Sequence, residues 1–391
     1  MSNNTTTARS GRLRRVLTRI GLGLLGLLLV FLGWVRCTFG GYGEPFEDRS
    51  GPPQIPASQV EVVATLDEPP GNIAVSADGR VFLTVHPESR PETTKFAELI
   101  DGELEPYPSA ALQAELFETV LGVAIDRQQR VWTIDHGNHG LGQPRLLAFD
   151  LATNTEVHRY DFTSRHAGAG SFFNDLQVSP DGRYIYIADI SVFGRHPALV
   201  IYDTHERIAW RRLEQHASVQ AEPWRIRHPD KDMVFFWGLL ALRPAVDSIA
   251  LDKQGQWLYY GAMTHGTMFR VPAAILHDPS IDEPAVRAAV EAFGDKPLSD
   301  GLSVDEHGTV YITDVEHRGI MTLDASGTLS TLIADPRIRW ADGLSFGPDG
   351  WLYVSDSAIP DIMLQSKGHI TDAAPYHVFR FKPGPMGIPG Q

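Results

Sequence analysis

Short runs in which apolar and polar residues alternate recur along the chain, and most of them come in pairs separated by a turn. Six pairs align on one apolar position, at Ile73, Val123, Leu176, Ile249, Leu302 and Leu344. These positions are separated by 50, 53, 73, 53 and 42 residues. An alternating run, a polar or Gly-containing turn and a second alternating run are typical of a β-hairpin. A hairpin that recurs six times predicts a repeat architecture.

Further strand-like runs follow most of the hairpins, such as 145–150 and 155–161 after the second one. Four strands in about 50 residues, repeated six times, predict an all-β fold, a six-bladed β-propeller over residues 59–382. The last blade has an inner hairpin and the run 376–381, but it lacks an outer strand. The run 59–66 precedes the first repeat and can supply that strand, which would leave no bare sheet edge.

Two segments interrupt the pattern of repeats. Residues 214–245 are rich in aromatic side chains and too long for a turn, so they form either a loop over the channel mouth or an excursion on the outer surface. Residues 281–294 have helical spacing, with Ala and Val on one side, and are expected to replace or cover an outer strand.

The first 36 residues differ from the rest of the chain. Five arginines between residues 9 and 19 precede an apolar run over 20–35, which predicts an N-terminal transmembrane helix following a cytoplasmic basic tail. Residues 37–58 are Gly- and Pro-rich and are typical of a linker, and 383–391 form a C-terminal tail. The propeller would then lie outside the cytoplasm, in the periplasm or the extracellular space. A cleaved signal peptide is the alternative, and it would make the protein secreted.

Charge and cysteine content exclude several classes of function. The first 36 residues hold six Arg and no acid, which leaves 28 basic and 48 acidic side chains in the remainder, a balance of −20. Such a surface repels phosphate backbones, so nucleic acid is not an expected partner. The single cysteine, Cys37, excludes an internal disulfide and a Cys-based metal site. The Gly-x-Ser-x-Gly match at residues 343–347 falls in a predicted inner hairpin and not at a strand-to-helix elbow, and no His-Glu-x-x-His motif occurs, which disfavours a serine triad and a zincin site.

Polar residues open the inner strands of four repeats, at one end of the predicted channel. They are Asn174, Asp247, Asp300 and Asp342. Oxygen ligands of this kind suit a hard divalent cation such as Ca²⁺ or Mg²⁺, and we assign Asn174, Asp247 and Asp300 as candidate metal ligands. The structural alternative is that these side chains cap backbone N–H groups. A second set, Asp135, Asp189, Asp314 and Asp356, ends the second strands, and we expect it to bond the backbone of a neighbouring blade.

Four histidines follow second strands on the same face, namely His86, His136, His265 and His317. Neutral histidine can bind a metal or move a proton near pH 7. We therefore expect His136, His265 and His317, together with Asp342, to line a ligand-binding site at the channel mouth. A single histidine in a surface loop usually has no such role.

Several phrases resemble the major royal jelly and yellow protein family, within the wider group of regucalcin-type gluconolactonases. They are "WTIDHGN" (132–138), "FFNDLQVSPDGRYIYIADI" (172–190), "LSDGLSVDEHGTVYITDVEHRGI" (298–320) and "WADGLSFGPDGWLYVSDS" (340–357). The resemblance covers about residues 60–382. It implies a secreted ligand-binding protein, and some members are named for dopachrome conversion. Lactonase relatives hold one divalent cation with a Glu, an Asn and an Asp; here Asn174 and Asp300 match, but the Glu position falls on Gly71.

Three functions remain open at this point. The first is a membrane-anchored propeller outside the cytoplasm that binds a small polar or aromatic ligand at the channel mouth and is isomerase-like in its chemistry. The second is a metal-dependent lactone or ester hydrolase, in which a cation polarises the carbonyl and activates water. The third is a scaffold whose rim contacts another envelope protein. The missing Glu favours the first over the second. The sequence leaves open whether the protein is an enzyme and whether it has a protein partner.

Overall fold

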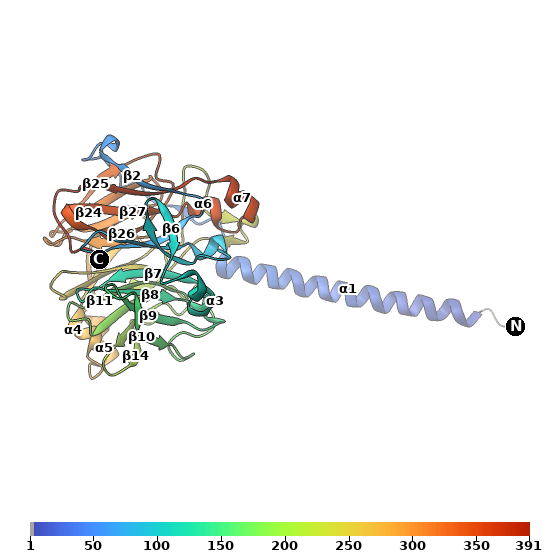
Figure 1. Cartoon of the computed structure of the whole chain (residues 1–391). Coiled ribbons are helices and arrows are strands. Elements are labelled where there is room, and N and C mark those ends of the chain that lie inside the picture. Colours follow the sequence, from blue (N-terminus) through green and yellow to red (C-terminus); the bar gives the residue numbers. More distant parts are fainter. Residues whose placement is uncertain (1–3) are drawn as a thin grey trace.

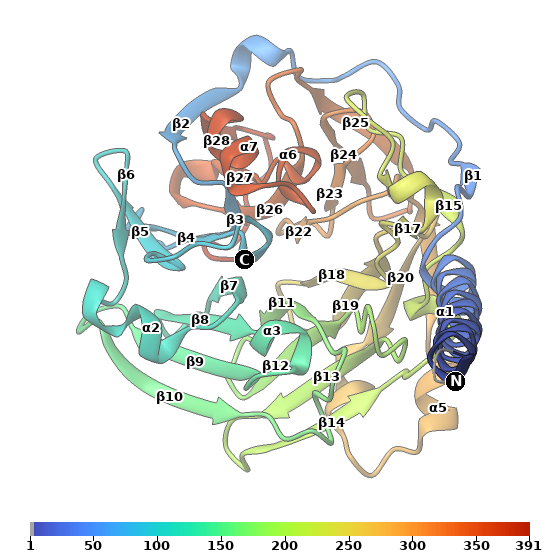
Figure 2. The ribbon, with the colours of Figure 1, turned by 90° about the vertical axis from the view of Figure 1, so that its right-hand side faces the viewer.

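The computed structural model describes residues 4–391, with side chains from residue 14 onward. Residues 1–3 of the predicted basic tail lie outside the described residues. Six four-stranded antiparallel sheets surround a central channel, so the chain is a six-bladed β-propeller as predicted (Figure 2). The innermost strands contact one another in cyclic order and close the ring between the first and the last blade.

Each blade consists of consecutive strands, except the last. Blade one consists of β3 (Pro70–Val75), β4 (Val81–Val85), β5 (Phe96–Ile100) and β6 (Glu103–Pro106). Blade two consists of β7 (Val120–Ile125), β8 (Arg130–Asp135), β9 (Arg145–Asp150) and β10 (Thr155–Asp161). Blade three consists of β11 (Phe173–Val178), β12 (Tyr184–Asp189), β13 (Ala198–Asp203) and β14 (Ile208–Arg212). Blade four consists of β18 (Val246–Leu251), β19 (Trp257–Ala262), β20 (Thr267–Pro272) and β21 (Glu291–Asp295). Blade five consists of β22 (Leu302–Val304), β23 (Val310–Asp314), β24 (Gly319–Leu323) and β25 (Leu329–Ala334). Blade six consists of β26 (Ala341–Phe346), β27 (Leu352–Asp356), β28 (Tyr376–Phe381) and β2 (Glu61–Leu66).

The last blade takes its outer strand from the start of the propeller. β2 pairs antiparallel with β28, with Glu61 opposite Arg380 and Leu66 opposite Tyr376. The predicted closure is therefore confirmed. Because β2 satisfies the outer edge of β28, blade six has four strands like the other blades, and the two ends of the propeller hold each other in place.

The core lies between the blades. Most positions in the inner three strands of a blade are buried, because each blade packs between two neighbours and its inner strands face protein on both sides. Outer strands such as β10 alternate between exposed and half-buried residues. The inner hairpins therefore carry the apolar runs from which the repeat is recognisable in the sequence.

The helices are few, and none of them belongs to a blade sheet. The long helix α1 (Asn4–Phe39) projects from one face of the ring (Figure 1). The others are α2 (Gln113–Leu116), α3 (Gly137–Gly140), α4 (Ala273–His277), α5 (Glu283–Ala288), α6 (Ile359–Ile362) and α7 (Lys367–Asp372). Within Arg14–Phe39 of α1, an 18-residue window has a mean hydropathy of 2.2, and none of that window is buried against the protein. It is long and apolar enough to cross a membrane, although a signal sequence would meet the same criteria.

Two irregular segments have defined places in the structure. Of the two alternatives for residues 281–294, replacement of an outer strand is excluded, since β21 follows α5 directly and completes blade four. The linker 37–58 packs on the propeller, where Arg49 donates to the carbonyl oxygens of Gly266 and Lys296 and Phe46 is buried. The segment therefore fixes the end of α1 to the ring.

The segment 214–245 lies on the face from which α1 emerges, which we call the mouth face. It contains the short strands β15 (Trp224–Arg225), β16 (Val234–Phe235) and β17 (Leu240–Ala241), and β15 pairs in parallel with β1 (Glu44–Pro45). His228 contacts the carbonyl oxygen of Arg339, and the backbone N–H of Arg227 donates to Glu316. These bonds place the segment on the mouth face, over the ends of blades five and six.

The C-terminal tail closes the opposite end of the channel (Figure 1). Its last two residues bond three blades: Ile125 N–H donates to the Gly390 carbonyl at 2.9 Å, Phe346 N–H to the Gln391 carbonyl at 3.1 Å, and Ser303 Oγ to that same Gln391 carbonyl at 3.1 Å. Gly390 N–H returns a bond to Phe346 at 2.9 Å. The tail therefore covers the end of the channel that lies opposite the mouth face.

Candidate functional site at the channel mouth

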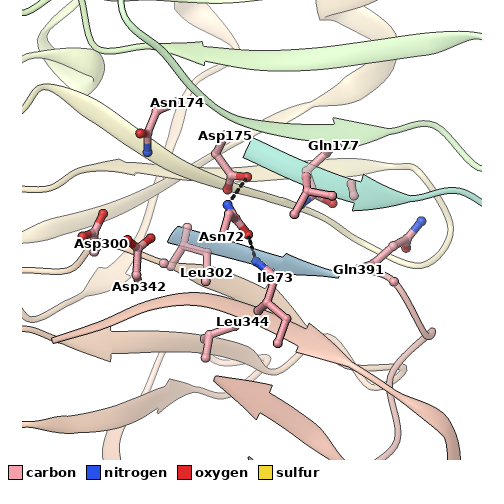
Figure 3. A pocket seen from close by; sticks show the side chains of 15 residues that line it. Asn72, Ile73, Asn174, Asp175, Gln177, Asp300, Leu302, Asp342, Leu344 and Gln391 are labelled. Carbon is pink, nitrogen blue, oxygen red and sulfur yellow. Dashed lines mark hydrogen bonds between the residues drawn. The ribbon is translucent and has the colours of Figure 1, made fainter. Parts of the chain in front are cut away.

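The inner strands are bulged where they reach the mouth. The antiparallel register shifts between Phe173 and Leu176 in β11, between Val246 and Ser248 in β18, and between Ala341 and Leu344 in β26. A bulge adds a residue to one strand and redirects its side chains. As a result both Asn174 and Asp175 line the channel, together with Asn72, Asp300 and Asp342 (Figure 3).

The glycine of the repeated Asp-Gly-Leu phrase has a packing role. A Cβ on Gly301 would overlap the carbonyl oxygen of Asp342, and a Cβ on Gly343 would lie 2.7 Å from the Asn72 side chain. Neighbouring inner strands thus approach each other at these glycines, where any larger residue would separate the blades. The phrase recurs because each copy places an acid on the rim next to a close contact between blades.

The carboxylates of this rim are deeply buried and close to one another. Burial raises the pKa of Asp175 to about 7 and that of Asp300 to about 6. Burial, and then repulsion from Asp300, raise the pKa of Asp247 and Asp342 well above the ordinary value. The rim therefore takes up protons near neutral pH.

Buried donors hold individual carboxylates of the rim. The Asn174 side-chain amide donates to Asp247, the Trp340 indole donates to Asp300 at 2.5 Å, and Asn72 donates to Asp175 at 3.3 Å. Lys296 is fully buried, and its positive charge acts to lower the pKa of Asp247, while burial lowers the pKa of the lysine itself to about 7. Each acid thus has its own polar neighbour.

This arrangement does not fit a bound metal. Among residues 14–391, no group of three or more His, Cys, Asp or Glu side chains is placed to hold a metal ion. An oxygen of each candidate ligand, Asp247 and Asp300, already accepts a hydrogen bond, from Asn174 and Trp340 respectively. The cavity lined by Asn174 and Asp300 has a volume of only about 10 Å³, enough for about one water molecule, and Asp247 does not line it.

The four histidines of the mouth face are placed at different points. His86 is buried with its Nε2 3.8 Å from Asp342, and burial lowers its pKa to about 3. His265 lies 3.7 Å from Glu222, and His317 contacts Asp314 at 2.9 Å. Neither of the latter two lines the rim cavity or the pocket described next, so a ligand role for them stays a prediction.

A larger pocket of about 330 Å³ opens on the same face between blades one and two. Three segments form it: the loop after β4, the approach to β7, and the turn after β8, which includes α3. Its lining is Val85, Pro87, Glu88, Arg90, Pro91, Lys95, Glu118, Thr119, Val120, His136, Asn138 and His139. The volume lies in the range of small-molecule sites, and the lining combines apolar walls with charges of both signs.

His136 is the predicted ligand residue that lines this pocket. Its ring stacks on Phe172 at a centroid distance of 4.0 Å, and its Nδ1 accepts from the backbone N–H of His139 at 3.0 Å. Burial lowers the pKa of His136 well below the ordinary value, so the ring is neutral at pH 7. With Nδ1 accepting, the ring proton is on Nε2, which is buried and has no hydrogen-bond partner among the described residues.

A second titratable pair lies in the pocket. Glu88 Oε1 is 3.9 Å from His139 Nε2. Burial raises the pKa of Glu88 and lowers that of His139, which favours the neutral form of both groups. His139 is also held in the left-handed region at φ 58°, which costs conformational energy in a residue with a Cβ. A carboxylic acid and a neutral imidazole at this distance can exchange a proton through a ligand.

The second set of aspartates braces loops, but not in the expected way. Asp135 accepts from the backbone N–H groups of Glu118, Thr119 and Gly137, and Asp189 accepts from that of Phe172. Glu118, Thr119 and Phe172 lead into the first strand of the same blade, and Gly137 follows the second strand of its own blade, so the expectation of bonds to a neighbouring blade is wrong. The reason is that the second strand ends beside the point where its own hairpin begins.

Comparison with known proteins shows which family this chain resembles. Residues 118–335 match the family model described as major royal jelly protein. Protein yellow of Drosophila yakuba and of Drosophila melanogaster are each 25% identical over 197 residues, and the match spans 46% of this chain and 36% of either relative. The chain thus matches about a third of the length of these curated relatives.

Solved structures share the fold at low identity. A gluconolactonase from Xanthomonas campestris is 15% identical and covers 88% of this chain and 97% of its own, with a TM-score of 0.52. A luciferin-regenerating enzyme is 12% identical and covers 85% and 97%, with a TM-score of 0.54. At these identities the likeness concerns the propeller alone. The family model matches more than half of the residues, and this chain belongs to the major royal jelly protein family.

Proposed function

We propose that this protein binds a small polar or aromatic ligand in the mouth pocket between blades one and two, and that α1 anchors it to a membrane with the propeller outside the cytoplasm. The observation that carries the proposal is the neutral His136 ring, which lines a pocket of about 330 Å³ with its buried Nε2–H unpartnered among the described residues. A buried donor without a partner costs about 1–3 kcal/mol, and a ligand acceptor would recover that energy.

The lining suggests the chemical class of the ligand. Val85, Pro87 and Val120 offer apolar surface, while Glu118 and Lys95 offer charges of opposite sign. A flat ring with an acceptor for His136 and a cationic or zwitterionic substituent satisfies these groups. Aromatic amines are of this kind, which agrees with the expectation of a polar or aromatic ligand at the mouth.

The Glu88–His139 pair favours isomerase-like chemistry over simple binding. The raised pKa of Glu88 increases its protonated fraction, and in that form Glu88 can donate a proton to one ligand atom while neutral His139 accepts one from another, so the ligand is rearranged without net proton exchange. The pair then needs no cofactor. The proton balance is restored when the two groups exchange a proton across their 3.9 Å separation after the product leaves.

The gluconolactonase-type alternative depends on a divalent cation at Asn174, Asp247 and Asp300. Binding would require Asn174 to turn its amide oxygen toward Asp247, and Trp340 to release Asp300. It would also displace protons from carboxyl groups whose pKa is raised. Calcium should therefore raise the melting temperature more at pH 8 than at pH 6 if this site is a metal site, and a lack of any shift at pH 8 would exclude it.

A thermal-shift screen of the full chain with aromatic amines and lactones tests the ligand site. His136→Phe keeps the stacking on Phe172 and removes the Nε2–H, whereas His205→Gln alters an exposed histidine as a control. We expect an aromatic amine to raise the melting temperature of the wild type and of the control. For His136→Phe, the same rise should require at least a tenfold higher concentration of the amine. An identical shift in all three proteins would place the ligand elsewhere.

A further inference from the structure

Large aromatic side chains are exposed on the mouth face beside the end of α1. Trp237 is 91% exposed, and Phe236 and Phe193 are each 57% exposed. We call these three residues the aromatic rim. Phe236 and Trp237 lie in the turn η5 (Phe236–Gly238), with φ 51° and 55°. A turn that holds two bulky residues in the left-handed region and leaves both rings in solvent has no evident role in the packing of the propeller.

The aromatic rim borders α1 from two sides. Phe193 packs edge-to-face against Phe39 at a centroid distance of 6.1 Å, and Phe39 packs against Trp34 at 5.9 Å. On the other side, Arg36 donates to the carbonyl oxygen of Trp237 at 2.9 Å. Figure 2 shows α1 end-on at the border of the ring, next to β15 and β17.

The contact points on α1 fix the depth of the rim. The apolar run ends at Val35, and the helix rises about 1.5 Å per residue, so Arg36 and Phe39 lie within about 6 Å of the end of that run. If the run spans the hydrocarbon layer, these residues and their aromatic neighbours are at the level of the lipid headgroups. Trp, Tyr and positively charged residues are concentrated at this level in membrane proteins.

We propose that the mouth face rests on the bilayer surface, with Phe193, Phe236 and Trp237 inserted in the headgroup region. This inference rests on the proposed anchoring by α1. The occupant is a lipid surface and not a protein, because the part of α1 next to the rim carries an exposed apolar stretch long enough to cross a membrane. With a balance of −20 on the residues after 36, the chain is repelled by anionic lipids, so the contact is aromatic and insensitive to salt.

The docked face brings the ligand pocket to the membrane. His139 lines the pocket and packs against Phe193 at a centroid distance of 5.2 Å. Trp34, Phe39, Phe193 and His139 thus form a continuous row from the helix to the pocket. A ligand that partitions into the headgroup region, as an amphiphilic aromatic molecule does, would reach the pocket along this row without crossing bulk water.

Fluorescence quenching in vesicles tests the docking. The full chain is reconstituted in phosphatidylcholine vesicles with acyl chains brominated near the headgroup, and the quenching of tryptophan emission is compared for wild type, Trp237→Phe and Trp34→Phe. The chain has 8 tryptophans, of which Trp132 and Trp340 are fully buried. If Trp34 and Trp237 both reach the lipid, we expect each variant to lose about half of the quenching.

The variants separate the docking from the anchoring. Loss of quenching in Trp34→Phe but not in Trp237→Phe would overturn the docking and leave the anchor in place. Unchanged quenching in both variants would overturn the anchoring as well. Trp237 is almost fully exposed, so its replacement should not affect folding, and a far-UV circular dichroism spectrum identical to that of the wild type serves as the control. Addition of roughly 0.5–1 M salt should leave the Trp237 contribution unchanged.

Discussion

The buried acids of the channel rim should make the protein less stable in its ionised form, and Asp300→Asn measures this effect. The pKa of Asp300 rises from 3.8 to about 6 in the folded protein, because burial disfavours the carboxylate. Because the folded protein holds this proton more tightly than the unfolded chain, the fold is most stable at a pH below 3.8, where Asp300 is protonated in both states. That stability is lost as the pH rises from 3.8 through about 6, where folded Asp300 ionises. At pH 8 the ionised Asp300 thus costs about 3 kcal/mol, at about 1.36 kcal/mol per pKa unit.

The substitution by asparagine mimics the protonated acid. The side-chain oxygen of the introduced amide could still accept the hydrogen bond that the Trp340 indole donates to Asp300. Removal of the charge also relieves Asp247 and Asp342, because repulsion from Asp300 is the second cause that raises their pKa. We therefore expect Asp300→Asn to be more stable than the wild type by about 2–3 kcal/mol at pH 8, and by less than about 1 kcal/mol at pH 4.

Thermal unfolding of the full chain in a non-ionic detergent provides the assay. Near-UV circular dichroism follows the loss of packing at pH 4 and pH 8, and a gain of this size raises the melting temperature by several degrees. Asp67→Asn, at an exposed aspartate, is the matched control and should change little at either pH. A variant that is less stable than the wild type at pH 8, or that gains equally at both pH values, would refute the reasoning.

Packing and charge give three further predictions. Gly301→Ala should destabilise the ring by about 3 kcal/mol or more, since its Cβ would overlap backbone of the next blade, whereas Gly51→Ala, with nothing nearby, should leave the melting temperature unchanged. Removal of residues 388–391 deletes hydrogen bonds to three blades, worth about 1 kcal/mol each, and should lower the melting temperature without affecting ligand shifts at the mouth. The pKa of His317 is raised by its bond to Asp314, so the stability that the pair adds is present at pH 6 and lost as the pH rises through the raised value. Thermal unfolding of His317→Gln should therefore show a deficit at pH 6 and none at pH 9.

The propeller could be predicted from the sequence because each blade is marked by a hairpin whose two strands are close together in the chain. Each inner hairpin is buried on both faces, so apolar alternation and a turn recur in every blade, and the count of repeats is the count of blades. The closing strand β2 was predictable from the unsatisfied edge of the last blade. The rim was only partly predictable: Asn72 and Asp175 were missed, because strict alternation does not foresee the bulges that turn a second residue into the channel.

The mouth pocket was largely beyond prediction. It combines loops from two blades, and those loops do not recur in the repeat, so no alignment of the six units brings Glu88 next to His139. His136 was found because it follows a second strand, as His265 and His317 do. That shared position in the repeat does not place the three side chains in one site, because each loop turns differently once it leaves its strand.

The pairing of β2 with β28 has a consequence for how the protein is made. Glu61 and Arg380 form an ion pair at 2.9 Å, yet they are separated by 319 positions in the chain. A strand that leaves the ribosome among the first must therefore wait, unpaired, until one of the last has been synthesised. In the proposed topology β2 begins at Glu61, a short segment after the end of α1 at Phe39. The propeller would therefore assemble next to the membrane, and the pairing of β28 with β2 would close the ring there. Chaperones and proteases outside the cytoplasm would meet an open ring, lacking its last blade, on that surface.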